Sequence, residues 1–537
     1  MAPQPLSAPL SARAAAASLL LGAATAAAAV SARPNVVLFV PDELRAESMG
    51  LFGGPAATPN FARLAAQGTA FSRAFSTYPV CTQSRASFLT GRYTHSAGHR
   101  SLWDPLRFTE PNLLAYAKQS NYSVFWAGKN DAMDVPSFNK SVDEAGEWGL
   151  GASGGNAFTI DDPRYYSFIA NESSVATPAT AHDGACVQHA VRFLEARNAS
   201  GDERPFFVYL PMMSPHPPYG CPAPFYGFSG AIPDLRPPDL PGKPDFHARI
   251  RYYRNATKWE DGTLERVQRL YLGCVDYSDW VLGQLLDALE RLGLDESNTA
   301  IVVTADHGDY GGDFGLVEKW PSGLEDVLLN VPMIMRVPGG VAGQRVDDAL
   351  VQHMDLTPTL LDAMQVPLEH VQFGVSQLKL LTGTSQPDLS RVVFAEGGYS
   401  TLEPRDFEGD CSDPLRNLCD PAGIYYPKGV QEWTEKLTVC RAYMVRTQTH
   451  KLVRRSDPLD ADHDSELYDL VADPRELRNV YANASYAGVR AALTTTLLEW
   501  MLQTSAVNVL PFRGSRLGDA LAPDEVDRVM PQGNWSR

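Results

Sequence analysis

Polar and charged side chains follow the ends of four short apolar runs in this sequence. The runs are Val36–Val40, Ser123–Ala127, Phe206–Leu210 and Ala300–Thr304, and the residues that follow them are, in turn, Asp42 and Glu43; Lys129; His216; and Asp306, His307 and Asp309. Carboxylate oxygens favour Ca²⁺, Mg²⁺ or Mn²⁺, whereas structural zinc prefers cysteine and histidine. Lysine and histidine beside them can bind an anion. Each residue alone has an ordinary alternative, such as a turn-forming aspartate or a solvated lysine, so the predicted metal and anion site depends on their occurring together.

A second chemical feature is the segment Cys81–Arg92, with the sequence CTQSRASFLTGR. Cys81 precedes a predicted helix, Ser84–Leu89, whose N-terminus stabilises negative charge and offers N–H donors to an anion. Arg85 lies four residues after Cys81 and can point back toward the same place. The alternative is a disulfide cysteine in front of an ordinary amphipathic helix.

These residues need a scaffold that brings the strand ends together. Helical patterns separate the apolar runs, and one of them begins at Thr58-Pro59, with Thr58 as N-cap, and ends at Gly68. Longer amphipathic patterns cover His182–Arg197 and Thr263–Leu292. Strands that alternate with helices predict an α/β fold with a mostly parallel sheet flanked by helices, in which ligands bind outside the carboxyl ends of the strands.

The sequence pattern changes after residue 385. Val392–Ala395 and Ala442–Arg455 have the pattern of strands in a smaller sheet, and a helix is predicted over Tyr486–Gln503. These features predict a C-terminal α+β subdomain, residues 386–537, after a larger domain that covers residues 33–385.

The N-terminus has the pattern of a signal peptide over residues 1–32. Arg13 is the positive flank, Ala14–Val30 is the apolar run, and Val30-Ser31-Ala32 fits a cleavage site. Asn-X-Ser/Thr sequons follow at Asn121, Asn139, Asn171, Asn198, Asn255, Asn483 and Asn534. Together they predict a secreted glycoprotein with an extracellular or lysosome-like location and no membrane span after signal cleavage. A formal net charge of −17 argues against a nucleic-acid partner.

A series of short motifs occurs along this chain in the same order as in the sulfatase family and resembles the motifs of that family. The resemblance runs from Pro34 to Val480. The motifs are Pro41-Asp42-Glu43-Leu44-Arg45, Thr58-Pro59-Asn60-Phe61, the Cys81–Arg85 box, Thr90-Gly91-Arg92-Tyr93, Gly128-Lys129, Ser214-Pro215-His216-Pro217-Pro218-Tyr219, Thr304-Ala305-Asp306-His307-Gly308-Asp309, Gly315 with Lys319, and Leu467-Tyr468-Asp469-Leu470 with Asp473-Pro474. The resemblance implies the alkaline-phosphatase-like fold, with a catalytic sulfatase domain over residues 33–385.

The resemblance also implies that Cys81 is oxidised by a formylglycine-generating enzyme to formylglycine, an aldehyde. One hydroxyl of its hydrate attacks sulfur and displaces the alcohol, and the other then loses its proton so that sulfate is expelled. The conversion leaves six of the seven cysteines for up to three disulfides.

The family roles carry over to matching positions. One divalent metal, with Ca²⁺ expected and Mn²⁺ or Mg²⁺ as alternatives, would be held by Asp42, Asp306, His307 and the modified Cys81, with Glu43 as a fifth ligand or a neighbour of the ligands. The metal would neutralise the sulfate oxygens and the leaving oxygen together with Arg85, Lys129, His216 and Lys319. Lys319 or His216 would assist the leaving group.

Three positions depart from the family pattern. Gln83 stands where the modification box usually has proline, which bears on how efficiently Cys81 is converted. Asp131 stands where many members have a histidine that triggers sulfate release, so the substitutes are His95, His99 or Asp131 itself. His307 stands where many animal arylsulfatases have asparagine. The resulting Asp-His pair resembles that of iduronate-sulfatase-like, choline-sulfatase-like and phosphonate-hydrolase-like members.

The expected function is therefore sulfuric ester hydrolysis, with a sulfated sugar or another organic sulfate as substrate. Two alternatives stay open at this point. One is a phosphodiesterase or phosphonate monoester hydrolase on the same fold, because metal, formylglycine and basic residues serve both anions. The other is an inactive protein that binds sulfated glycans, which Gln83 and Asp131 would favour.

Overall fold

The structure is a computed structural model that describes residues 33–146, 155–172, 177–403, 408, 418–460 and 464–505. The predicted signal peptide, residues 1–32, and the sequon at Asn534 lie outside these residues. Among the helices of the described part, none is both long enough and apolar enough to cross a bilayer.

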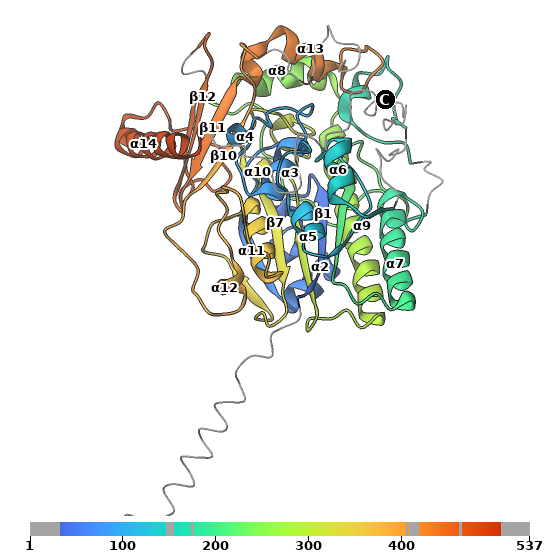
Figure 1. Cartoon of the computed structure of the whole chain (residues 1–537). Helices are drawn as coiled ribbons and strands as arrows, with labels where there is room; N and C mark the ends of the chain where they lie inside the picture. The colour runs from blue at the N-terminus through green and yellow to red at the C-terminus, as the bar shows by residue number, and fades with distance from the viewer. Residues whose placement is uncertain are drawn as a thin grey trace, which may run out of the picture.

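A nine-stranded, mostly parallel sheet forms the centre of the molecule (Figure 1). Its strand order is β4-β3-β5-β1-β6-β7-β2-β8, and β9 also pairs with β2. The strands are β1 (Asn35–Asp42), β2 (Thr69–Phe75), β3 (Ser123–Trp126), β4 (Glu144–Ala145), β5 (Phe206–Pro215), β6 (Thr299–Thr304), β7 (Asn330–Arg336), β8 (Gln344–Val346) and β9 (Val351–Gln352). The four predicted strands are β1, β3, β5 and β6, which are parallel neighbours. This confirms the predicted fold class, although β7, which the sequence patterns did not predict, runs antiparallel to β6 and β2.

The central strands are apolar because helices cover both faces of the sheet. Val36–Val40 of β1 and Ala300–Val303 of β6 have no exposed surface. One layer contains α2 (Pro59–Ala66) and α7 (His182–Ser200), which both contact α9 (Thr263–Arg291). The other contains α3 (Cys81–Thr90), α5 (Leu113–Gln119) and α11 (Leu356–Ala363). The remaining helices of this part are α4 (Thr94–Ala97), α6 (Val135–Ser141), α8 (Asp245–Tyr253), α10 (Asp326–Leu329) and α12 (Leu378–Leu381).

A smaller antiparallel sheet follows the central one. It has the order β10-β11-β12-β13, with β10 (Val393–Gly397), β11 (Arg441–Arg446), β12 (His450–Ser456) and β13 (Glu466–Asp469). Helix α14 (Ala487–Thr504) packs against this sheet, and α13 (Tyr426–Thr434) packs against α8 of the larger part (Figure 1). This confirms the predicted smaller α+β part; the segment predicted as one strand region, Ala442–Arg455, is the hairpin β11–β12.

Disulfide formation is more limited than the six remaining cysteines would allow. Cys221, after β5, is bonded to Cys274 on α9, and Cys419 is also disulfide-bonded. Cys186 and Cys440 are thiols. The three disulfides that were the upper limit are therefore not reached.

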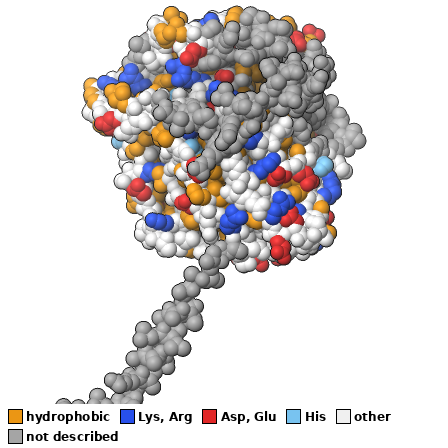
Figure 2. Space-filling model, in the orientation of Figure 1, with side chains coloured by type: hydrophobic (Ala, Val, Ile, Leu, Met, Phe, Trp, Pro, Cys, Tyr) orange, Lys and Arg blue, Asp and Glu red, His pale blue; other side chains and the backbone are white. Residues whose placement is uncertain are grey.

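The surface carries both signs of charge. On the face shown in Figure 2, the described Lys and Arg side chains are interspersed with Asp and Glu rather than gathered. The described residues of this face therefore form no extended basic patch.

The N-terminus of α2 is capped differently from the prediction. Thr58 has a left-handed backbone (φ 43°) and its side chain makes no capping bond. The Asp279 carboxylate of α9 instead accepts the backbone N–H groups of Asn60 and Phe61, each at 2.9 Å, and the side-chain amide of Asn60 at 2.8 Å. Thr58 is therefore the N-cap residue and Pro59 the first helical residue, as predicted, but a carboxylate distant in sequence accepts the helix N–H groups in place of the Thr58 side chain.

This cap gives a first prediction. Asp279→Ala should lower the free energy of unfolding by ~1–2 kcal/mol, because two helix N–H groups lose a buried acceptor. The measurement is the thermal unfolding midpoint. Asp276→Ala is the matched control on the same helix, since burial raises the pKa of Asp276 to about 6 and removing this carboxylate should cost nothing. Equal midpoints for the two variants would contradict the capping role.

Candidate active site

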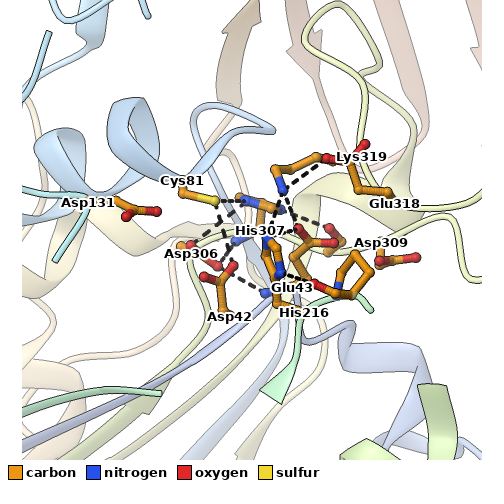
Figure 3. Close-up of polar contacts among 12 residues, drawn as sticks. Asp42, Glu43, Cys81, Asp131, His216, Asp306, His307, Asp309, Glu318 and Lys319 are labelled. Carbon is orange, nitrogen blue, oxygen red and sulfur yellow. Dashed lines mark hydrogen bonds and ion pairs between the residues drawn. The ribbon is translucent and has the colours of Figure 1, made fainter. Parts of the chain in front are cut away.

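The carboxyl ends of β1 and β6 place three carboxylates side by side. Asp42 is the last residue of β1, Glu43 follows it, and Asp306 lies two residues beyond the end of β6. All three are fully buried. The backbone N–H of Glu43 donates to Asp306 Oδ1 at 3.1 Å, which joins the two strand ends directly (Figure 3).

Cys81 is the first residue of α3 and lies directly against these groups. The helix begins at the cysteine itself, three residues earlier than predicted. Cys81 Sγ is 3.3 Å from His307 Nε2, 3.7 Å from Asp42 Oδ1 and 3.6 Å from Lys129 Nζ. The nucleophile position and the carboxylates are thus in contact (Figure 3).

Two buried cations neutralise Asp42 and Asp306. Arg85, one turn along α3 from Cys81, contacts Asp306 Oδ2 through Nε at 3.0 Å and through Nη2 at 2.8 Å, and Asp42 Oδ2 at 3.2 Å. Lys129 donates to Asp42 Oδ2 at 2.6 Å and forms an ion pair with Asp131 at 2.8 Å. Burial alone would raise the pKa of Asp42, but the positive charges of Lys129 and Arg85 outweigh it and hold this pKa well below its usual range. Asp42 is therefore ionised.

A second group lies around Glu43. Lys319 donates to Glu43 Oε1, and its Nζ is 3.2 Å from His216 Nε2. His216 Nδ1 lies 2.5 Å from the carbonyl of Pro217, so Nδ1 carries the proton and Nε2 has the lone pair. Burial and the neighbouring Lys129 and Lys319 lower the pKa of His216 well below its usual value. His216 is therefore a neutral imidazole that faces a protonated lysine.

The backbone at Glu43 is strained. It has φ 66°, in the left-handed region that a residue with a Cβ rarely adopts. The hydroxyl of Tyr271 donates to the Glu43 carbonyl at 2.7 Å, and Asp306 accepts its N–H. Buried contacts on both sides of the residue thus offset the strain and aim its side chain at Lys319.

The donor set fits a divalent cation. Asp42, Cys81, Asp306 and His307 each offer a ligand atom within 4.8 Å of the others, as do Asp42, Glu43, Cys81 and His216. His307 Nδ1 lies 2.8 Å from the Gly308 carbonyl, which fixes the proton on Nδ1 and leaves the Nε2 lone pair to face Cys81. Glu43 Oε2 is buried and makes no hydrogen bond within the described part of the chain. Carboxylate oxygens in this number favour Ca²⁺, Mg²⁺ or Mn²⁺ over zinc.

Of the other sequence candidates, Asp309 lies beside Glu43 (Figure 3), whereas the candidate histidines His95 and His99 lie elsewhere. Asp309 accepts the hydroxyl of Tyr219 at 2.8 Å, and His95 contacts Glu396 and Thr504 at 2.9 Å each. His99 lies 3.2 Å from Glu110. Of the three candidates for the group that triggers sulfate release, Asp131 is the one that joins the cluster, because it forms an ion pair with Lys129. Its side chain is 20% exposed.

Sequence patterns missed a buried histidine behind the cluster. Ser84 Oγ donates to the Asp306 carbonyl at 2.6 Å and lies 2.8 Å from His353 Nε2. His353 precedes a helix late in the larger domain, and no local pattern marks it. Burial, with His307 nearby, lowers its pKa to about 3, so it is neutral and supports the ligand loop through Ser84.

Family models cover most of the chain. A model described as sulfatase matches residues 34–366, and one described as N-sulphoglucosamine sulphohydrolase, C-terminal, matches residues 401–503.

Individual relatives are distant but match along nearly the whole length. Iduronate 2-sulfatase of Mus musculus is 28% identical over 86% of this chain and 93% of its own. N-acetylglucosamine-6-O-sulfatase of Bacteroides thetaiotaomicron is 24% identical over 88% of this chain and 87% of its own. The solved structure of a phosphonate monoester hydrolase from Silicibacter pomeroyi superposes with a TM-score of 0.69 at 23% identity, over 88% of this chain and 96% of that one, which shows the shared fold.

The donor set gives a second prediction. Asp306→Asn should lower the affinity for a divalent cation by at least ~10–100-fold, since even residues that only support ligands have effects of this size. Metal content after purification, and the stabilisation that Ca²⁺ gives in a thermal melt, are the measurements. Asp131→Asn is the control, because Asp131 pairs with Lys129 outside the donor set. Wild-type metal content in Asp306→Asn would refute the proposed ligand set.

Proposed function

This chain belongs to the sulfatase family, and we propose that it releases sulfate from the ester of a sulfated sugar, with a formylglycine derived from Cys81 and one divalent cation, Ca²⁺. The observation that carries the proposal is the position of Cys81. It begins α3 in direct contact with His307, Asp42 and Lys129, where a nucleophile, a cation site and a basic side chain meet.

Formylglycine supplies a hydrated aldehyde, of which one hydroxyl attacks sulfur and the other allows sulfate to leave. The chain's own residues place this group. Backbone N–H groups in the first turn of α3 favour negative charge at residue 81. Asp42, Asp306 and His307 would hold the cation beside this residue, and Glu43 lies on the side of Lys319.

The basic residues divide into two roles. Arg85 is fully buried and contacts the carboxylates of Asp42 and Asp306, so it fixes the ligands. Lys129 contacts the nucleophile position directly and Lys319 lies beside Glu43, so both can contact the sulfate oxygens. Lys319 is protonated and touches the lone pair of His216, so this pair can deliver a proton to the departing alcohol.

Asp131 is our candidate for the base that releases sulfate. His95 and His99 are held by Glu396, Thr504 and Glu110, whereas the Asp131 carboxylate lies 2.8 Å from Lys129 Nζ. Lys129 in turn contacts Cys81 Sγ at 3.6 Å. A proton leaving residue 81 therefore has a carboxylate acceptor one contact away.

The substrate class follows from the relatives and the expected location. Two relatives are named for action on iduronate and N-acetylglucosamine sulfates. We propose that the chain enters the secretory pathway, where sulfated glycans occur. The sequon asparagines Asn121, Asn139, Asn171, Asn198 and Asn483 are exposed in the structure, which suits glycosylation.

Activity and modification are tested together. The protein is made in a secretory host that has a formylglycine-generating enzyme, and the tryptic peptide Ala74–Arg85 is examined by mass spectrometry. We expect formylglycine at residue 81, which would show that Gln83 is tolerated, and hydrolysis of an aryl sulfate in preference to an aryl phosphodiester. Cys81→Ala should abolish turnover, because the nucleophile is lost.

The same assays separate the alternatives. A clear preference for the diester would replace sulfatase with phosphodiesterase activity. Unchanged turnover in Cys81→Ala would refute the nucleophile. Unmodified Cys81 with binding but no cleavage of a sulfated sugar would favour the glycan-binding alternative.

The role of Asp131 gives a further prediction. Asp131→Asn should lower steady-state turnover by ~10²–10⁴-fold, the usual loss when a general base is removed. Alcohol release should outrun sulfate release by about one equivalent per enzyme in the first turnover, because only the second half of the reaction is slowed. His99→Gln is the comparison variant and should show no such burst. Equal release of both products by Asp131→Asn would exclude this role.

A further inference from the structure

A buried lysine from the smaller part of the molecule reaches toward the active site. Lys428 is on α13, and its side chain is only 2% exposed. Its ammonium lies 2.7 Å from Glu408 and 3.5 Å from Glu318. Glu318 immediately precedes Lys319, and Figure 3 shows the two side chains together at the edge of the cluster.

Glu318 is shared among three cations. Its carboxylate lies 3.2 Å from Lys319, 2.9 Å from Arg254 at the end of α8, and 3.5 Å from Lys428. Lys319 in turn has two competing carboxylates, Glu318 and Glu43. Whether Lys319 pairs mainly with Glu318 or with Glu43 therefore depends on how far Arg254 and Lys428 neutralise the Glu318 carboxylate.

The backbone fixes Glu318 in this place. Like Glu43, it has a left-handed backbone, with φ 64°. Its N–H donates to the Tyr219 hydroxyl at 2.7 Å, and its carbonyl accepts the N–H of Tyr310 at 3.0 Å. Glu318 cannot move away from Lys319 without breaking these buried contacts, so the balance of charge is set by the side chains around it.

We propose that Lys428 is a positioning residue for the sulfatase reaction: it satisfies the Glu318 carboxylate, so that the Lys319 ammonium stays directed toward Glu43, His216 and the sulfate. The inference rests on the proposed function. It gives the C-terminal part of the chain a defined task in catalysis, which is to control Lys319 through a single carboxylate.

Electrostatics agree with this geometry. Burial would raise the pKa of Glu318, but Lys428 is the first of the cations that outweigh it and lower the pKa to about 2. The groups that face or surround Glu318 are Lys428, Tyr425 and Glu408 from the smaller part, Arg254 from the end of α8, Lys319 of its own loop, His216 from the loop after β5, and Glu43 from the end of β1. Among these, Lys319 and Lys428 are both protonated, so Glu318 is ionised throughout an ordinary assay range.

Loss of Lys428 should redistribute this charge. Glu318 would be left with Arg254 and Lys319, and its hold on Lys319 would strengthen at the expense of Glu43. The pKa of Glu318 would also rise from its depressed value, because the cation that lowers it most is gone. Below the new pKa the carboxylate becomes neutral and releases Lys319, so the defect should shrink as pH falls.

The experiment is a double-mutant cycle on the full-length, formylglycine-containing enzyme, assayed with an aryl sulfate from pH 4.5 to 8. We expect Lys428→Met to lower kcat by ~10–100-fold near pH 7, as a misplaced catalytic group does, and by less at the acid end. Lys428→Arg should restore most of the activity. Glu318→Gln combined with Lys428→Met should be no worse than Glu318→Gln alone, because the carboxylate through which Lys428 acts is gone.

Controls separate this inference from folding and from the proposed function. Lys436→Met changes a lysine just after α13 and should keep wild-type kcat. If Lys428→Met fails to fold, the pair Glu318→Gln and Glu318→Gln/Lys428→Met still carries the test. Losses that add in the double variant, or a failure of Lys428→Arg to restore activity, would overturn the positioning role. Inactive wild-type enzyme carrying formylglycine would instead overturn the proposed function.

Discussion

Buried negative charge at the carboxyl ends of β1 and β6 is the constraint on which the rest of the site depends. Asp42, Glu43 and Asp306 have no exposed surface, and carboxylates in such a place are stable only when paired. Arg85 and Lys129 supply the pairing on one side, and Lys319 supplies it on the other. The elements that carry these cations must therefore dock against the strand ends for the chain to fold.

This requirement explains why segments distant in sequence meet at one point. Helix α3 brings Cys81 and Arg85 together because they lie about one turn apart on the same helix. The loops that hold Glu43 and Glu318 have left-handed backbones, and each is fixed by a buried tyrosine hydroxyl, from Tyr271 and Tyr219. The strain at both positions is offset by contacts that also aim their carboxylates at Lys319.

The sequence predicted the parts of this arrangement that follow from local pattern. Buried parallel strands are apolar runs in the sequence, and their carboxyl ends share one edge of a sheet, so Asp42, Lys129 and Asp306 can be placed together from the sequence alone. The cap on α2, the support of the ligand loop by His353 and the contact of Lys428 with Glu318 could not. Each joins residues far apart in the chain, and an acidic or basic residue on a helix usually faces solvent.

The pairing of charges also bears on how an anion can be bound here. Arg85 and Lys129 each contact a carboxylate, so around Asp42 and Asp306 the two cations balance two anions and little positive charge is left over. Lys319 is likewise held by Glu43 and Glu318.

A sulfate ester that entered this site would meet carboxylates as well as ammonium groups. A divalent cation among Asp42, Asp306 and His307 would change that balance by two charges, which is enough to turn a neutral pocket into one that attracts an anion. The same argument explains why Lys428 belongs to the site although it touches neither the nucleophile nor the donor set: each cation that satisfies a surrounding carboxylate leaves Lys319 more able to act on the substrate.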